Sequence, residues 1–199
     1  MTLLAVIRHG PTAWNADGRV QGRTDVPLSA AGRAAVRRWA LPREVAAFAW
    51  VSSPLARCAE TARILRGAEV GRDARLVEMD WAAWEGATLA ALRAELGDLM
   101  RAWEAKGLDF RAPGGESPRE VQARIAPFLA DIAGRGEATL AVTHKGVIRA
   151  LYARAVGWDM TGRAPHKLRE PCIHLFRLAP DGTPAAERLN LPLDETGAP

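Results

Sequence analysis

The chain of 199 residues has little cysteine, little lysine and no long apolar run. Cys58 and Cys172 are its two cysteines, too few for a disulfide framework and without the spacing of a metal-binding motif. No stretch of about 18 apolar residues occurs, so we expect no membrane span. The apolar N-terminus lacks a basic leader and a cleavage site, which is typical of a buried strand rather than a signal peptide. These shortages favour a cytoplasmic protein with no membrane partner.

Positive charge is present but not concentrated. The net charge is +4, and lysine occurs only at Lys106, Lys145 and Lys167, so most of the basic residues are arginines. The arginines are scattered, and no zinc-finger spacing or aromatic-rich binding signature accompanies them. The charge therefore favours anionic partners only mildly and gives no support for a nucleic-acid partner.

Apolar runs and helical patterns alternate along the chain. Buried strands are predicted at Leu3–Ile7, Ala49–Ser52 and Thr139–Thr143, and Ile173–Leu178 alternates as expected nearer a sheet edge. Helices are predicted from Ser29 to about Trp39, after an N-cap at Ser53 with Pro54 in the first turn, over Ala87–Lys106, after the capping box Ser117-Pro118-Arg119-Glu120, and over Val147–Val156.

This alternation predicts one α/β domain over residues 1–199, with a largely parallel sheet covered by helices on both faces. The helical stretch near residues 79–113 is expected to be an insertion over one end of the sheet. Residues from about 180 to 199 are rich in proline and polar residues, and we expect a loose tail there.

Three predicted strands end in polar residues that could do chemistry. The strand ends carry Arg8-His9-Gly10, Ser52-Ser53-Pro54 and Thr143-His144-Lys145-Gly146. Ligands of open parallel sheets lie beyond the carboxyl ends of the strands, so we expect these residues in one crevice. Gly10 would let the backbone turn sharply and a ligand approach closely.

Phosphoryl transfer suits this set of residues. Guanidinium groups bind phosphate oxygens in a fork, and neutral imidazole is a nucleophile at physiological pH. A leaving alkoxide also needs an acid, for which Glu78 is a candidate and Asp80 a weaker one, since an apolar setting raises a carboxyl pKa.

The motifs also resemble a known family, the histidine phosphatase superfamily. The resemblance spans roughly residues 3 to 150 and consists of Arg8-His9-Gly10-Pro11-Thr12 with Asn15 and Gln21-Gly22, Leu28-Ser29-Ala30-Ala31-Gly32, Ser53-Pro54-Leu55-Ala56-Arg57-Cys58-Ala59-Glu60-Thr61, Glu78-Met79-Asp80 through Trp84-Glu85-Gly86, Pro113-Gly114-Gly115-Glu116-Ser117, and Val142-Thr143-His144. Six motifs in the family's order make chance agreement very unlikely.

The resemblance implies a fold and a set of roles. The fold would be the three-layer α/β/α sandwich of phosphoglycerate mutase-like proteins, with a helical insertion over the active site. His9 would accept the phosphoryl group, Arg8, Arg57 and His144 would surround its oxygens, and Glu78 would act as acid and then base. Asn15, Gln21, Gly22, Arg23 and Lys145 would contact the substrate, although Arg23 and Lys145 could equally point into solvent. Neither a metal nor a cofactor is implied.

Two departures from the family pattern stand out. Lys145 follows the second histidine where the family usually has glycine. Trp81-Ala82-Ala83 replaces the phenylalanine-glycine that usually precedes the tryptophan-glutamate-glycine motif.

Three functions fit the sequence. The first is a phosphatase, close to the α-ribazole phosphatase branch, that hydrolyses small-molecule phosphate monoesters as a monomer or homodimer. The second is a cofactor-dependent phosphoglycerate mutase, but mutases of the family carry an adjacent arginine pair and a tyrosine that are missing between Glu78 and Lys106. The third is a non-catalytic phosphate-binding protein. Hydrolysis is favoured, with α-ribazole 5′-phosphate, sugar phosphates and phosphoglycerates all open as substrates.

Overall fold

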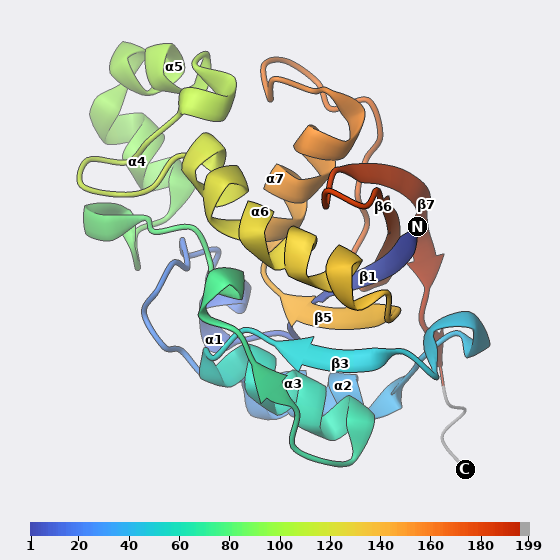
Figure 1. Ribbon diagram of the computed structural model, residues 1–199. Coiled ribbons are helices and arrows are strands. Elements are labelled where there is room, and N and C mark those ends of the chain that lie inside the picture. The colour runs from blue at the N-terminus through green and yellow to red at the C-terminus, as the bar shows by residue number, and fades with distance from the viewer. Residues whose placement is uncertain (196–199) are drawn as a thin grey trace.

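The computed structural model describes residues 1–195 and has a six-stranded sheet at its centre (Figure 1). The strands are β1 (Thr2–Arg8), β3 (Ala49–Ser52), β4 (Gly71–Arg72), β5 (Thr139–Thr143), β6 (Cys172–Leu178) and β7 (Pro184–Pro192), in the order β4-β3-β5-β1-β6-β7. Neighbours among β4, β3, β5 and β1 are parallel, and β6 runs antiparallel to both β1 and β7. A separate two-stranded sheet pairs β2 (Trp39–Ala40) with β8 (Asp194–Glu195).

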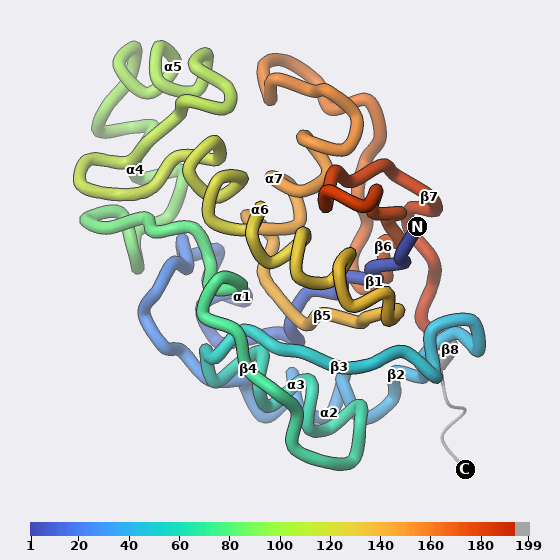
Figure 2. Tube along the Cα trace, viewed as in Figure 1, coloured from blue at the N-terminus to red at the C-terminus, as the bar shows by residue number. Residues whose placement is uncertain are grey.

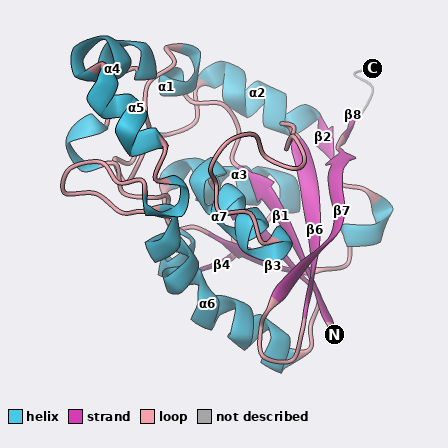
Figure 3. Ribbon diagram, turned by 90° about the horizontal axis from the view of Figure 1, so that it is seen from above, coloured by secondary structure: helices cyan, strands magenta, loops and turns pink. Residues whose placement is uncertain are grey.

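Helices cover both faces of the six-stranded sheet. They are α1 (Ala13–Ala16), α2 (Ala30–Arg38), α3 (Ala56–Arg66), α4 (Leu89–Leu96), α5 (Asp98–Glu104), α6 (Pro118–Arg135) and α7 (Lys145–Val156), with short 3₁₀ helices at Arg43–Val45, Ala74–Leu76, Ala82–Trp84 and Gly107–Asp109. Figure 3 shows α2 and α6 on opposite sides of the strands. The three-layer α/β/α fold with a mostly parallel sheet is therefore confirmed.

Strand β1 supplies side chains to two separate cores because successive residues of a strand face opposite ways. Leu4 and Val6 pack with the apolar residues of α6 and α7, whereas Ala5 and Ile7 pack with residues of α3. Burial on both faces fixes the position of the β1 carboxyl end, from which the site is built.

Side-chain caps set where the helices begin, and one predicted cap was wrong. Ser29 accepts from the Gly32 N–H at 2.9 Å, and Ser117 forms the expected capping box with Glu120. The helix after Ser53, however, starts only at Ala56, with Leu55 as its N-cap. The Ser53 hydroxyl lies 2.8 Å from His144 Nε2 instead, so this serine contributes to the site.

The stretch predicted as one helix over 87–106 is two. Gly97 separates α4 from α5 with φ of 51° and ψ of −121°, a conformation that favours glycine. The two helices pack on a cluster of buried residues of their own, Val20, Trp84, Leu92, Met100 and Ala112. This region projects beyond the end of the sheet (Figure 1).

The loose tail predicted from about residue 180 was wrong for most of its length. Residues Pro184–Pro192 form β7, which pairs with β6 at the sheet edge (Figure 2). The long-range pairing with β6 outweighs a polar composition that, by itself, suggests a coil. β6 is consequently next to the edge strand, while residues 196–199 lie outside the described part of the chain. No helix within residues 1–195 is long and apolar enough to cross a membrane.

Candidate active site

His9 lies directly after β1, inside the protein. Its backbone N–H donates to the Thr143 carbonyl at 3.0 Å, and 5% of the residue is exposed. Nδ1 lies 2.7 Å from the Gly10 carbonyl, an acceptor, so Nδ1 carries the proton and Nε2 keeps its lone pair. Burial, with the positive charge of Arg8 next, holds the pKa of His9 well below 6.5. The ring is therefore a neutral imidazole with a free nitrogen.

Gly10 is needed for a different reason from the sharp turn that we expected. Its φ is not in the left-handed region, but a Cβ at this position would lie 2.3 Å from Val36 Cγ2 of α2. Its N–H donates to Thr61 Oγ1 of α3 at 2.9 Å. The missing side chain lets α2 approach closely, which positions the segment after His9.

His144 faces His9 from the neighbouring strand. It follows β5, is fully buried, and its ring centroid lies 5.3 Å from that of His9. Its Nε2 contacts Ser53 Oγ at 2.8 Å and Cys58 Sγ at 3.3 Å. Burial, followed by His9 and Arg57, keeps the pKa of His144 well below 6.5, so this ring is neutral as well.

Arg57 is a fully buried cation at the start of α3. Its Nη1 donates to the Thr24 carbonyl at 3.0 Å and its Nη2 to the Gly22 carbonyl at 2.7 Å. Glu85 in turn accepts from the Arg23 N–H at 2.7 Å and the Thr24 N–H at 2.8 Å, so it fixes the loop that holds the guanidinium. Burial lowers the pKa of Arg57, and the nearby Cys58 and Glu78 oppose that lowering.

Glu78 reaches the same place from the segment after the 3₁₀ helix Ala74–Leu76, and 6% of it is exposed. Its oxygens accept from the Met79 N–H at 2.8 Å and the Gly146 N–H at 3.1 Å. Burial raises the pKa of Glu78, and these two N–H groups together with Arg57 and Arg8 only partly offset the rise. A Cβ on Gly146 would lie 2.4 Å from Glu78 Oε1, so the glycine that the site requires is Gly146 rather than residue 145.

Three buried side-chain donors at this site have no hydrogen-bond partner in the described structure. They are Arg8 Nε, Arg57 Nε and Gln21 Nε2. Buried donors are normally hydrogen-bonded, because a buried donor without a partner destabilises the folded protein by about 1–3 kcal/mol. Unpaired donors beside a neutral imidazole form a site that an anion with several oxygens would complete.

Asn15 and Gln21 are linked through Thr12. Asn15 Oδ1 accepts from the Thr12 N–H at 3.0 Å and caps α1, while Gln21 Oε1 accepts from Thr12 Oγ1 at 3.0 Å. Both carbonyl oxygens are thereby occupied, and the Gln21 amide nitrogen remains available.

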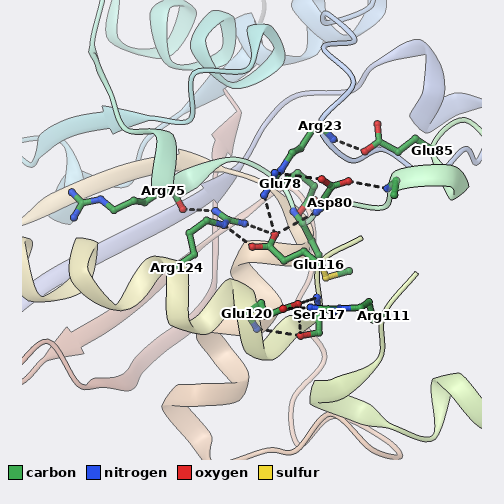
Figure 4. A network of polar contacts seen from close by, with 12 residues as sticks. Arg23, Arg75, Glu78, Asp80, Glu85, Arg111, Glu116, Ser117, Glu120 and Arg124 are labelled. Atoms are coloured by element: carbon green, nitrogen blue, oxygen red, sulfur yellow. Dashed lines mark hydrogen bonds and ion pairs between the residues drawn. The ribbon is translucent and has the colours of Figure 1, made fainter. Parts of the chain in front are cut away.

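Arg23 and Lys145 lie at the rim of the site. The Arg23 side chain is 46% exposed and reaches Asp80 at 3.3 Å and Glu116 at 3.5 Å (Figure 4). The Lys145 side chain is 56% exposed, with Nζ 3.8 Å from Glu170 Oε1, and Arg8 Nη1 donates to the other oxygen of Glu170. The structure thus brings His9, His144, Arg57, Glu78 and Arg8 together and leaves Arg23 and Lys145 outside that group.

Some positioning residues were not predicted. Thr61 and Ser53 gave no signal beyond their place in a motif, and Glu85 was part of the tryptophan-glutamate-glycine motif without a role. Glu170 lies far from every motif in sequence, so only the tertiary structure reveals its contact with Arg8.

The altered loop before Trp84 is strained. Ala82 has φ of 42°, in the left-handed region that favours glycine. Asp80 Oδ1 accepts from the Ala82 backbone N–H at 2.8 Å, so Asp80, the weaker acid candidate, stabilises the loop.

A neutral imidazole, the fully buried guanidinium of Arg57, the partly buried one of Arg8 and a protonatable carboxyl at the end of a parallel sheet define a phosphoryl-transfer enzyme of the histidine phosphatase type. The family model described as the histidine phosphatase superfamily (branch 1) matches residues 4–192, and the chain belongs to that superfamily.

Relatives carry both mutase and phosphatase names. Phosphoglycerate mutase-like protein 4 of Arabidopsis thaliana is 34% identical over 88% of this chain and 79% of its own length, and the probable phosphoglycerate mutase GpmB of Enterobacter sp. (strain 638) is 32% identical over 87% and 83%. Among solved structures, phosphoserine phosphatase from Entamoeba histolytica superposes with a TM-score of 0.80 at 27% identity, covering 96% of this chain and 98% of that one. Mycobacterial glucosyl-3-phosphoglycerate phosphatase gives 0.77 at 26% identity, covering 98% and 100%.

Proposed function

We propose that this chain hydrolyses small-molecule phosphate monoesters through a phosphohistidine on His9. The observation that carries the proposal is the meeting of a free, neutral His9 Nε2 with the unpaired donors of Arg8, Arg57 and Gln21. Such a site supplies a nucleophile together with fixed positive charge for phosphoryl oxygens.

In the first step, His9 Nε2 attacks phosphorus and the ester P–O bond breaks. Arg8 and Arg57 bind the oxygens that share the negative charge, and neutral His144 adds a hydrogen bond beside them. Asn15 and Gln21 would present their amide nitrogens to the same oxygens, and the Gly22 backbone would border the site.

Glu78 would handle the protons. Because burial raises its pKa, a larger share of this carboxyl is protonated near neutral pH than of an exposed glutamate. The acid gives its proton to the leaving alkoxide. The resulting carboxylate then takes a proton from the water that attacks phosphohistidine, and inorganic phosphate and free His9 result.

The mutase names of the sequence relatives keep phosphoglycerate mutase as the second candidate. The insertion argues against a mutase, because its arginines already form ion pairs. Arg93 Nη2 lies 2.7 Å from Glu104 Oε1. Arg101 pairs with Asp98, and Arg111 pairs with Glu120. No free adjacent arginine pair is present there within the described residues to hold a substrate acid for its return.

One experiment separates the candidates. The protein is incubated with 3-phosphoglycerate, with and without 2,3-bisphosphoglycerate, and both inorganic phosphate and 2-phosphoglycerate are measured. A panel of phosphate esters that includes p-nitrophenyl phosphate runs in parallel. We expect phosphate release to dominate; rapid isomer formation would establish the mutase, and inactivity on the whole panel would favour a binding protein.

We further propose a cytoplasmic enzyme with one domain, acting as a monomer or homodimer. Both cysteines are free thiols, Cys58 being buried, which suits a reducing compartment. Cell fractionation and light scattering after size-exclusion chromatography test these points, and recovery in an oxidising compartment would contradict the first.

A further inference from the structure

A cavity of about 640 Å³ opens beside Arg8, next to the proposed phosphate site. One wall is a single face of α7, because residues three, four and seven apart on a helix project the same way. That face carries Lys145, Ile148, Arg149 and Tyr152, and the segment 163–174 forms the opposite wall. The cavity therefore starts at a guanidinium of the site and extends along α7.

Cations dominate the lining of this cavity. A single carboxylate, Glu170, faces five basic side chains: Arg8, Lys145, Arg149, Arg163 and Lys167. Glu170 is itself engaged by Arg8 and Lys145.

The other three cations are not neutralised. Among the side chains of residues 1–193, no carboxylate forms an ion pair with Arg149, Arg163 or Lys167. A concave surface lined by charge of one sign raises the local concentration of ligands of the opposite sign. The uncompensated charge lies away from Arg8 and can act on a different part of a ligand.

Arg149 is the best-held of the three. It lies four residues after Lys145 on α7, about 6 Å along the helix axis. Its guanidinium carbon lies 5.5 Å from the centre of the Trp158 ring, and the Trp158 indole N–H donates to the Thr161 carbonyl at 2.9 Å. Desolvation lowers the pKa of Arg149. Arg149 stays exposed along the cavity, and a guanidinium held against an aromatic ring can bind an anion.

We propose that this cavity binds a second anionic group of the substrate, with Arg149 as its principal contact and Arg163 and Lys167 as supporting charges. The substrate is then a phosphate monoester with a carboxylate or a further phosphate a few bonds from the scissile phosphate. This assignment rests on the proposed function, because Arg8 belongs both to the phosphate site and to the cavity.

Matched substrates test the assignment. 3-Phosphoglycerate and glycerol 3-phosphate differ only in a carboxylate against a hydroxymethyl group, and glucose 1,6-bisphosphate against glucose 6-phosphate tests a second phosphate. For Arg149→Gln we expect KM to rise about 10-fold on the preferred doubly anionic ester, which corresponds to one charged hydrogen bond. The singly anionic partner and p-nitrophenyl phosphate should change less than about 2-fold.

Arg37→Gln is the control, because it removes the same charge from an exposed position on α2. Its kinetics should match the unmodified protein on every substrate. Equal KM changes in Arg149→Gln for both members of each pair, or no change for any, would overturn the subsite.

Binding separates this proposal from the catalytic one. Calorimetry of 3-phosphoglycerate and glucose 1,6-bisphosphate with His9→Ala protein needs no turnover, and adding Arg149→Gln should weaken the Kd of the preferred ligand about 10-fold. If the protein hydrolyses nothing yet shows this weakening, the proposed function fails and the subsite stands. If hydrolysis proceeds and the Kd values are unchanged, the subsite fails alone.

Discussion

The two ends of the candidate site are built differently. At the inner end, Arg57 and His144 are fully buried and His9 and Glu78 nearly so, and backbone groups hold three of these four side chains. At the outer end, cations such as Lys145 and Arg149 project from one face of α7 into an open cavity, with few fixed partners.

Under the two proposals, this contrast assigns the chemistry to the inner end and the choice of substrate to the outer end. His9 and His144 follow the ends of β1 and β5, and Arg57 lies at the start of α3, so the sheet that forms the core also fixes the geometry of these three groups. Glu78 comes from the loop after the 3₁₀ helix Ala74–Leu76 and is held by the Gly146 N–H. The outer groups belong to a helix surface and a loop, which can change without disturbing the core. Solved neighbours named for different substrates share this fold at TM-scores of 0.77 and 0.80, as such a division allows.

The largest effect is expected at the centre of the inner end. His9→Ala removes the phosphoryl acceptor and should lower kcat on p-nitrophenyl phosphate at least about 10⁴-fold. Acid-labile labelling by a ³²P-phosphate ester should disappear as well. His166→Ala, a change at the outer cavity, should stay within about 3-fold, and label retained by His9→Ala would rule out His9 as the acceptor.

Arg57→Lys probes whether the inner end needs a guanidinium or only a charge. An ammonium cannot span the Gly22 and Thr24 carbonyls and still bind phosphoryl oxygens, so kcat/KM should fall about 10²–10³-fold. Arg66→Lys, at the exposed end of the same helix, is the matched control and should be unchanged. Equal activity of the two variants would show that net charge suffices.

Glu78→Gln should separate substrates by their leaving group. Alkyl phosphates need a proton and should lose about 10²-fold or more, whereas p-nitrophenyl phosphate should lose less than about 10-fold. Rates for both substrates are measured across pH. Comparable losses on both would show that Glu78 is not the acid.

The pH profile follows from the same groups. Glu78 acts protonated and its pKa is raised, so activity on alkyl phosphates should fall with rising pH on a limb above pH 4.5 that the glutamine variant lacks. His9 acts neutral and its pKa is lowered, so activity should be lost toward acid only well below pH 6.5. An acid limb at or above pH 6.5 would contradict a neutral, buried His9.

The inner end was largely predictable from the sequence because it depends on local signals. Short apolar runs that end in polar residues mark β1 and β5, and the rules of parallel sheets bring those ends together. The hydrogen bonds from Gly146 to Glu78 and from Arg57 to Gly22 were not predictable, because they depend on how distant loops pack.

The errors arose where tertiary contacts outweigh local preference. Ser53 has the sequence of a helix cap but lies against His144. Pro184–Pro192 has a coil-like composition but pairs with β6, and α4 and α5 separate at Gly97 because a single glycine there takes up a left-handed turn. The cavity along α7 had no motif, since Arg149 and Glu170 meet the site only in three dimensions.

The smallest effect is expected in the strained loop beside the insertion. Ala82→Gly removes the strain of an alanine in the left-handed region, which should stabilise the folded protein by about 1–2 kcal/mol. Glycine also raises the conformational entropy of the unfolded chain, which should destabilise the folded protein by about 0.5–1 kcal/mol. Urea unfolding should therefore show a gain of about 0.5 kcal/mol, by difference of those two terms. Ala83→Gly, whose φ is ordinary, should instead destabilise. The N–H that Asp80 binds is kept in Ala82→Gly, so activity on p-nitrophenyl phosphate should stay within about 2-fold. A large loss of activity would mean that this loop sets the inner geometry, and the division between the two ends would fail at that point.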